Sequence, residues 1–142
     1  MTASASAIAD ELVTVLEAMA NTTASKRGYD ILETSADRFC VVVRPSVGSN
    51  TLAQFGGDSV TEHQDITLLA EAFVKDLGDP YDYMTAQWTF LNQVQTQLDD
   101  YATLNDTCMF AMLERWEVPE TEYNIGGQIW QPIRFWVRCL VV

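Results

Sequence analysis

Basic residues and histidine are scarce in this sequence. Its 142 residues include 8 Lys and Arg against 20 Asp and Glu, one His, and a formal net charge of −12. Binding nucleic acid by neutralising phosphates requires clustered Lys and Arg, so the composition excludes this class of function. An acidic surface instead repels DNA, anionic membranes and other acidic proteins. Three interpretations stay open: simple solubility, a surface that faces DNA without binding it, and a mimic of DNA.

Cysteine is also rare, with Cys40, Cys108 and Cys139 as its three occurrences. No two of them form a CxxC pair, and their spacings differ from those of a zinc site. Each lies in an apolar run, which predicts buried free thiols that pack as small hydrophobic groups. The odd count favours a reducing compartment.

Long apolar runs are missing. No stretch approaches the 18 consecutive apolar residues of a membrane span, so we expect none. Asp10, Glu11 and Glu17 interrupt the N-terminal run, and the first basic residue is Lys26, which argues against a secretory signal. With 48% apolar and 20% charged residues, the chain is expected to form one folded domain, residues 1–142.

Motifs of known catalytic sites are absent from the sequence: there is no GxGxxG, phosphate loop, HExxH or GxSxG. His63 has no Cys or Ser pattern near it to activate. The acidic pairs Asp99–Asp100 and Glu120/Glu122 are expected at a helix end and a loop tip, as solvated charges. The stretch 58–65 lacks the alternating ligands of a calcium loop. We therefore predict no catalytic residue, no cofactor and no metal, and a protein that is not an enzyme.

The first half of the chain alternates between clear and weak patterns. Helical spacing of apolar residues predicts a helix over 6–21. The polar stretch 22–36 is expected to be a connector, with a short strand near 29–32. The β-branched run 38–44 predicts a strand. The many turn formers of 45–64 predict a long irregular segment, either an extended binding arm or a free linker, and Leu52 and Phe55 favour the arm.

The second half is more regular. Residues 65–75 fit a strand and a helix equally well. A helix is predicted over 79–101, begun by Asp79 and Pro80. The apolar stripe of this helix is expected to lie on a sheet and comprises Tyr81, Met84, Trp88, Leu91, Val94, Leu98 and Tyr101.

Two strands are predicted to end the chain, over 107–118 and 129–142, as a hairpin whose loop turns at Gly126–Gly127. The expected fold class is α+β. A mostly antiparallel sheet is packed by one long and one shorter helix, with a long loop or arm and a C-terminal β-hairpin.

One face of the last predicted strand combines tryptophan and arginine. Trp130, Arg134, Trp136 and Arg138 alternate with the aliphatic residues and share the opposite face. Trp and Arg are both enriched at protein interfaces. This face is therefore predicted to be either an interface or a second covered face of the sheet.

The order of elements and three local segments resemble one known family. The segments are 108–116 (CMFAMLERW), 122–130 (EYNIGGQIW) and 133–141 (IRFWVRCLV). The chain resembles the siphophage tail-terminator (tail-completion) proteins, which are related to neck and minor tail proteins. The resemblance implies a strand at 65–75 and no catalytic residues.

The resemblance also implies partners. It implies a homo-oligomeric, hexameric ring in the virion, made in the host cytoplasm, which caps the tail-tube protein and meets the neck or head-completion protein. DNA would pass through its lumen without specific binding. The predicted interface residues are Leu52, Gln54, Phe55, Glu120, Glu122, Tyr123, Trp130, Arg134 and Trp136. Alternatives are another head–tail joining or minor tail protein, or an acidic binding module such as an inhibitor of a basic nuclease.

Overall fold

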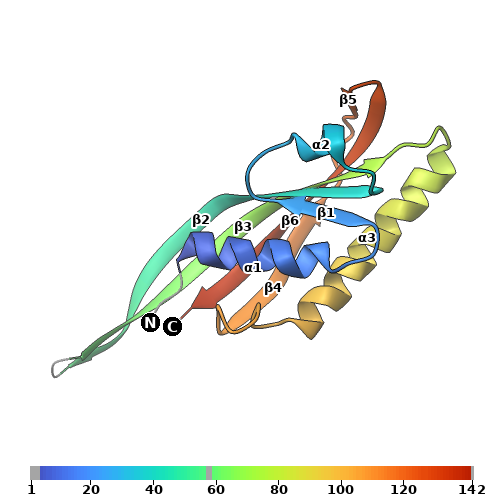
Figure 1. The fold of residues 1–142 in the computed structure, drawn as a ribbon. Helices are drawn as coiled ribbons and strands as arrows, with labels where there is room; N and C mark the ends of the chain where they lie inside the picture. The colour runs from blue at the N-terminus through green and yellow to red at the C-terminus, as the bar shows by residue number, and fades with distance from the viewer. Residues whose placement is uncertain (1–3, 57–58, 142) are drawn as a thin grey trace.

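In the residues that the structure describes, six strands form a single mixed sheet, and three helices accompany it (Figure 1). The computed structural model describes the backbone of residues 4–56 and 59–141, and the side chains of these residues outside 50–63. The elements are α1 (Ala5–Glu17), β1 (Thr22–Ser25), α2 (Ile31–Thr34), β2 (Phe39–Gly56), β3 (Ser59–Lys75), α3 (Pro80–Asp100), β4 (Phe110–Glu117), β5 (Tyr123–Ile125) and β6 (Gln128–Val141). The α+β class and the mostly antiparallel sheet are as predicted.

The strand order is β1-β2-β3-β6-β4, and β5 also pairs with β6. β1 runs parallel to β2, whereas the other pairs are antiparallel. The predicted C-terminal hairpin is confirmed, since β4 and β5 both pair with β6 on the same side. Gly126 and Gly127 form the two-residue turn before β6 with φ of 60° and 84°, which favour glycine. The two edges of the sheet are therefore β1 and β4.

One face of the sheet holds the main core. Alternate residues of β2, β3 and β6, such as Val41, Ala70 and Phe135, are buried against α1 and α3. α1 contributes a stripe at helical spacing, which includes Ile8 and Leu12. The helix 6–21 is confirmed in kind, although it ends at Glu17 because Asn21 has a φ of 56° and β1 follows.

The opposite face is covered over one end only. There α2 and β5 enclose a small second cluster of Leu32, Cys40, Val42, Phe73 and Trp130. Trp130 is fully buried in it. Beyond this cluster, no helix of the described residues packs on this face.

The connector 22–36 differs from its prediction. The strand lies at 22–25 as β1, and 29–32 instead leads into α2. The prediction of a strand near 29–32 is therefore wrong. The true strand, β1, was missed because it is short and polar, and its sequence shows no alternation of apolar residues. It becomes a strand through backbone pairing with Phe39–Val42 of β2.

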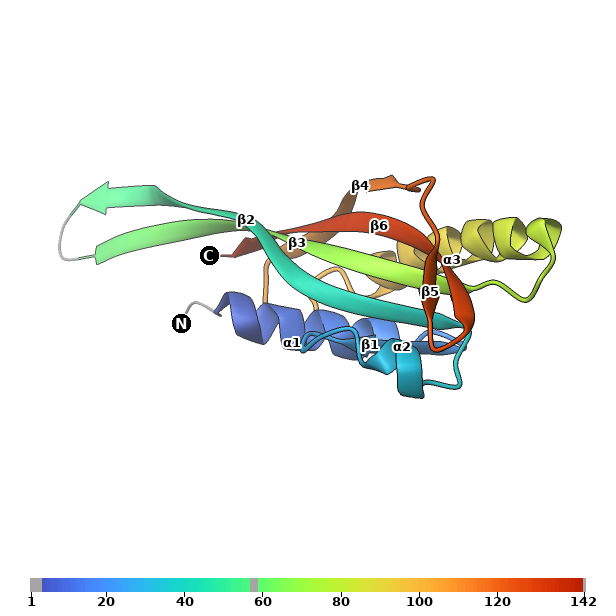
Figure 2. The ribbon, with the colours of Figure 1, turned by 90° about the horizontal axis from the view of Figure 1, so that it is seen from above.

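The stretch 45–64 is a strand hairpin, so the prediction of an irregular segment is wrong. β2 extends far beyond the predicted 38–44, and its pairing with β3 continues to Gly56↔Ser59. β6 pairs with β3 only as far as Gln64↔Val141, so the distal hairpin projects from the body as an arm (Figures 1 and 2). The ambiguous run 65–75 is resolved as a strand.

α3 has the predicted bounds, and the Asp79 side chain accepts from the Tyr81 N–H at 3.0 Å as its N-cap. Its buried face is different from the predicted one. The buried residues are Ala86, Phe90, Leu91, Val94 and Leu98, whereas Tyr81, Met84, Trp88 and Tyr101 are exposed. The Trp88 ring contacts Trp116 of the edge strand β4, so the outward side of α3 lies beside this edge, whereas Phe90 packs against Phe39 and Phe135 of the sheet.

Candidate assembly surface

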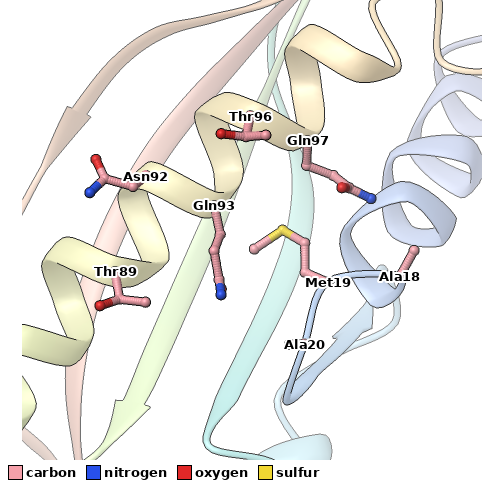
Figure 3. Close-up of a pocket in the computed structure, with 8 residues that line it drawn as sticks. All are labelled: Ala18, Met19, Ala20, Thr89, Asn92, Gln93, Thr96 and Gln97. Carbon is pink, nitrogen blue, oxygen red and sulfur yellow. The ribbon is translucent and has the colours of Figure 1, made fainter.

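A groove of about 430 Å³ lies between the end of α1 and the side of α3 (Figure 3). Its lining has no charged residue and comprises Ala18, Met19, Ala20, Thr89, Asn92, Gln93, Thr96 and Gln97. The Gln97 amide donates to the Val15 carbonyl at 2.8 Å, and Gln93 reaches into the space beside Ala20. Such a lining can bind through hydrogen bonds and apolar contacts, but it holds no group that transfers a proton.

Metal-ligating side chains do not gather into a cluster in the described part of the chain. No group of three or more His, Cys, Asp and Glu there could hold a metal ion. The thiols are buried and free, as predicted. A hydrogen bond with Cys108 and burial raise the pKa of Cys139, and burial raises that of Cys40, so neither is a ready thiolate.

The open face of the sheet carries ion pairs between neighbouring strands. Arg138 donates to both carboxylate oxygens of Asp65, and this contact holds the pKa of Asp65 below its usual range. Arg134 pairs with Glu117 across β6 and β4 at 3.3 Å. These arginines are therefore occupied within the molecule, and the open face is not a free basic patch.

A third ion pair joins β2, β3 and the segment before α2 into a small network. The Arg44 guanidinium lies 2.8 Å from a Glu71 oxygen, which also accepts from the Tyr29 hydroxyl at 2.7 Å. Nearby, the Arg115 guanidinium stacks 3.8 Å from the centre of the Trp136 ring. Stacking leaves Trp136 half-buried, so a partner would meet Arg115 before it meets this ring.

An exposed apolar surface lies at the β4 edge. Trp88 of α3 and Trp116 of β4 meet edge to face, with ring centroids 6.3 Å apart. They are 62% and 46% exposed. We call the hollow of about 200 Å³ beside them the aromatic groove, which is lined by Met84, Gln87, Trp88, Leu91, Trp116 and Val118.

Most of the exposed large hydrophobic side chains belong to α3, β4 and the loops that flank them. In the part of the chain whose side chains are described, all of them except Tyr29 and Val47 lie between residues 77 and 118. A concentration of exposed apolar side chains on one side of a protein indicates a binding surface. Trp and Met are also residue types enriched at interfaces.

The predicted interface residues are scattered in the structure. Glu120 and Glu122 are exposed in the loop before β5, and Tyr123 is half-buried with its ring 5.6 Å from that of Phe73. Trp130 is a core residue, which corrects its prediction as an interface residue: α2 and β5 cover its end of the sheet. Arg134 and Trp136 are half-buried by their own neighbours.

Leu52, Gln54 and Phe55 lie on the β2 strand of the arm. Their side chains, like that of His63 on β3, fall outside the part that the structure describes. The backbone alone places all four residues beyond the β6 pairing, on the projecting hairpin.

Sequence reasoning missed Met84 and Trp88, which it assigned to the core. A signal was present, because Ala86 and Phe90 fall between the positions of the predicted stripe. The apolar residues of this helix therefore cover a larger part of its surface than the part that packs on the sheet. Met84 and Trp88 belong to the apolar part that does not pack on the sheet, and they remain exposed.

Comparison with protein-family models finds no matching family, and no curated protein matches the chain. None of the helices in the described ranges is long and apolar enough to cross a membrane. The chemistry of the exposed surface is therefore the basis for a functional proposal.

Proposed function

We propose that this protein is a structural subunit that closes into a homo-oligomeric ring and serves as a tail terminator of a long-tailed phage. In this role a ring, of six copies, caps the tail tube and joins it to the neck. The observation that carries the proposal is the exposed aromatic groove at one edge of the sheet. Ring subunits meet head to tail through unlike surfaces, so each needs an exposed contact surface on one side.

The order of elements supports the resemblance on which the role in a phage tail rests. The resemblance implies a strand at 65–75, and β3 occupies this stretch. The first helix, the long helix α3 and the terminal pair of strands follow one another in the expected order, although a strand hairpin stands where a long loop was expected.

The arm supplies a second contact surface. Residues 45–57 contain no charged residue, although the chain as a whole carries −12. The first strand of the projecting hairpin can approach another acidic subunit or the tail tube without like-charge repulsion, whereas the rest of the hairpin carries Asp58 and Glu62. The strands of the hairpin also offer unpaired backbone edges. We propose that the arm contacts the tube or the neighbouring subunit.

The acidic charge suits a channel for DNA. Six copies multiply the net charge of −12 sixfold. Carboxylates that line a lumen repel phosphates, so DNA can slide through without being bound. No specific contact with DNA is expected.

Electron microscopy tests the proposal directly. The purified protein is imaged alone and after mixing with tail tubes assembled from the tube protein of the same phage. We expect rings of about six subunits or caps at one end of the tubes. Monomers that never decorate tubes would contradict the proposal and favour an acidic inhibitor, to be tested by a low-salt pull-down with a basic nuclease.

A further inference from the structure

The two edges of the sheet differ in charge. Residues 76–122, which contain α3, β4 and the loops beside them, hold ten acidic residues and one basic residue, Arg115. Residues 4–44, which contain α1, β1 and α2 at the other edge, hold six acidic and four basic residues. β1 and β4 are the two ends of the strand order, so these two strands lie at opposite edges of the sheet.

Arg27 is an exposed basic residue in the turn that follows β1. Its neighbour Lys26 is held by Asp10, with nitrogen and oxygen 2.8 Å apart. For Arg27, the described residues provide no side-chain hydrogen bond, ion pair or aromatic contact. In an acidic protein, such an arginine is available to a partner.

The aromatic groove has the chemistry to receive an arginine. The edge-to-face pair Trp88–Trp116 presents indole rings, which attract a guanidinium through cation–π contact. The loop after β4 adds the exposed carboxylates Glu120 and Glu122 close in sequence to Val118 of the groove. A planar guanidinium forms strong paired hydrogen bonds with carboxylates.

We propose that the aromatic groove of one copy binds the turn of residues 26–29, through Arg27, of a second copy of this chain. The inference rests on the proposed ring and names the contact that closes it. The acidic β4 edge of each subunit then faces the more basic β1 edge of the next. A two-fold contact of the β4 edges would instead place the acidic sides of both copies against each other, which costs energy.

Two variants test the two sides of the contact separately. Trp88→Ala disrupts the aromatic groove, and Arg27→Glu disrupts the turn that is proposed to bind it. Both side chains are exposed, so both variants are expected to fold, which circular dichroism checks. The matched controls are Tyr101→Ala, an exposed aromatic outside the groove at the C-terminal end of α3, and Arg27→Lys, which keeps the charge but removes the planar guanidinium.

Self-association is measured by sedimentation equilibrium and native mass spectrometry, with and without tail tubes. We expect each disruptive variant to raise the subunit dissociation constant about 30-fold or more, the effect of losing an interface hot spot. Tyr101→Ala should stay within about threefold of the wild type, whereas Arg27→Lys, which keeps only the charge, should fall between the wild type and Arg27→Glu.

Mixing the two variants is the decisive measurement. Each variant alone is expected to be monomeric, but an equimolar mixture retains one intact contact, between the Arg27 turn of one and the groove of the other. We expect 1:1 heterodimers that grow no further. A contact between two identical edges would not give this result.

The outcomes distinguish this inference from the proposed ring. If the wild type forms rings and neither variant weakens them, the contact is wrong and the ring stands. If the mixture stays monomeric although each variant disrupts the ring, the pairing of turn and groove is wrong. If the wild type neither self-associates nor caps tubes, both proposals fail.

Discussion

Two tryptophans show how burial separates a core residue from a surface one. Trp130 is fully buried among Phe73, Leu32 and their neighbours, whereas Trp88 is mostly exposed. We predict that Trp130→Ala lowers the free energy of unfolding by about 3–5 kcal/mol, because it leaves a cavity. Urea unfolding followed by far-UV circular dichroism measures this, with Trp88→Ala as the control. Equal losses for both variants would contradict the burial of Trp130.

The Asp65–Arg138 pair gives the stability of the protein a pH dependence. Arg138 lowers the pKa of Asp65 in the folded state below the unfolded value of about 3.9. The contribution of this carboxylate is therefore present above the unfolded pKa and is lost as the pH falls through the folded pKa.

We predict that Asp65→Asn shifts the urea midpoint slightly downward at pH 7, and that wild type and variant converge in acid. Urea titrations from pH 7 to pH 3 check this. Asp100→Asn, at an exposed position, is the control and should show no such convergence. A constant difference at every pH would mean that the ion pair does not stabilise the fold.

The arm can be removed at a point that the strand pairing defines. Asn50 pairs with Gln64, and Gln64 is the residue of the β3–β6 pairing that lies nearest to the arm. Replacing residues 51–63 with Asn-Gly therefore leaves a two-residue turn on a strand pair that the body already holds.

We predict that this truncation changes the free energy of unfolding by less than about 1 kcal/mol, because it removes no pairing with β6. Binding to tail tubes, measured by co-sedimentation, should be lost. The control places Asn-Gly at residues 57–58 alone and keeps the arm at full length. Unchanged binding of the truncated protein would remove the arm from the contact.

Charge acts at the scale of the whole molecule. With −12 overall and most arginines paired or stacked within the subunit, the surface offers no cluster of free cations to phosphates. We predict no binding of a 30-base-pair duplex even at about 50 mM salt, where non-specific binding is strong. Fluorescence anisotropy measures it. A dissociation constant in the micromolar range would contradict the proposal that DNA slides past this protein.

Local sequence determined several elements of the fold. The cap formed by Asp79 and Pro80 and the long apolar periodicity define α3, and the two-residue alternation defines β6. Both signals depend on residues close in sequence, so they can be recognised without knowledge of the tertiary structure. The apolar runs around the three cysteines likewise indicated buried thiols.

Only the tertiary structure decided the remainder. β1 and the arm are strands because a neighbouring strand satisfies their backbone groups, even where the sequence is polar or rich in turn formers. The same holds for the faces of the tryptophans: α2 and β5 cover Trp130, and the sheet ends at β4 before it reaches Trp88. The period of a sequence shows which residues share a face, but burial depends on whether another element lies over that face.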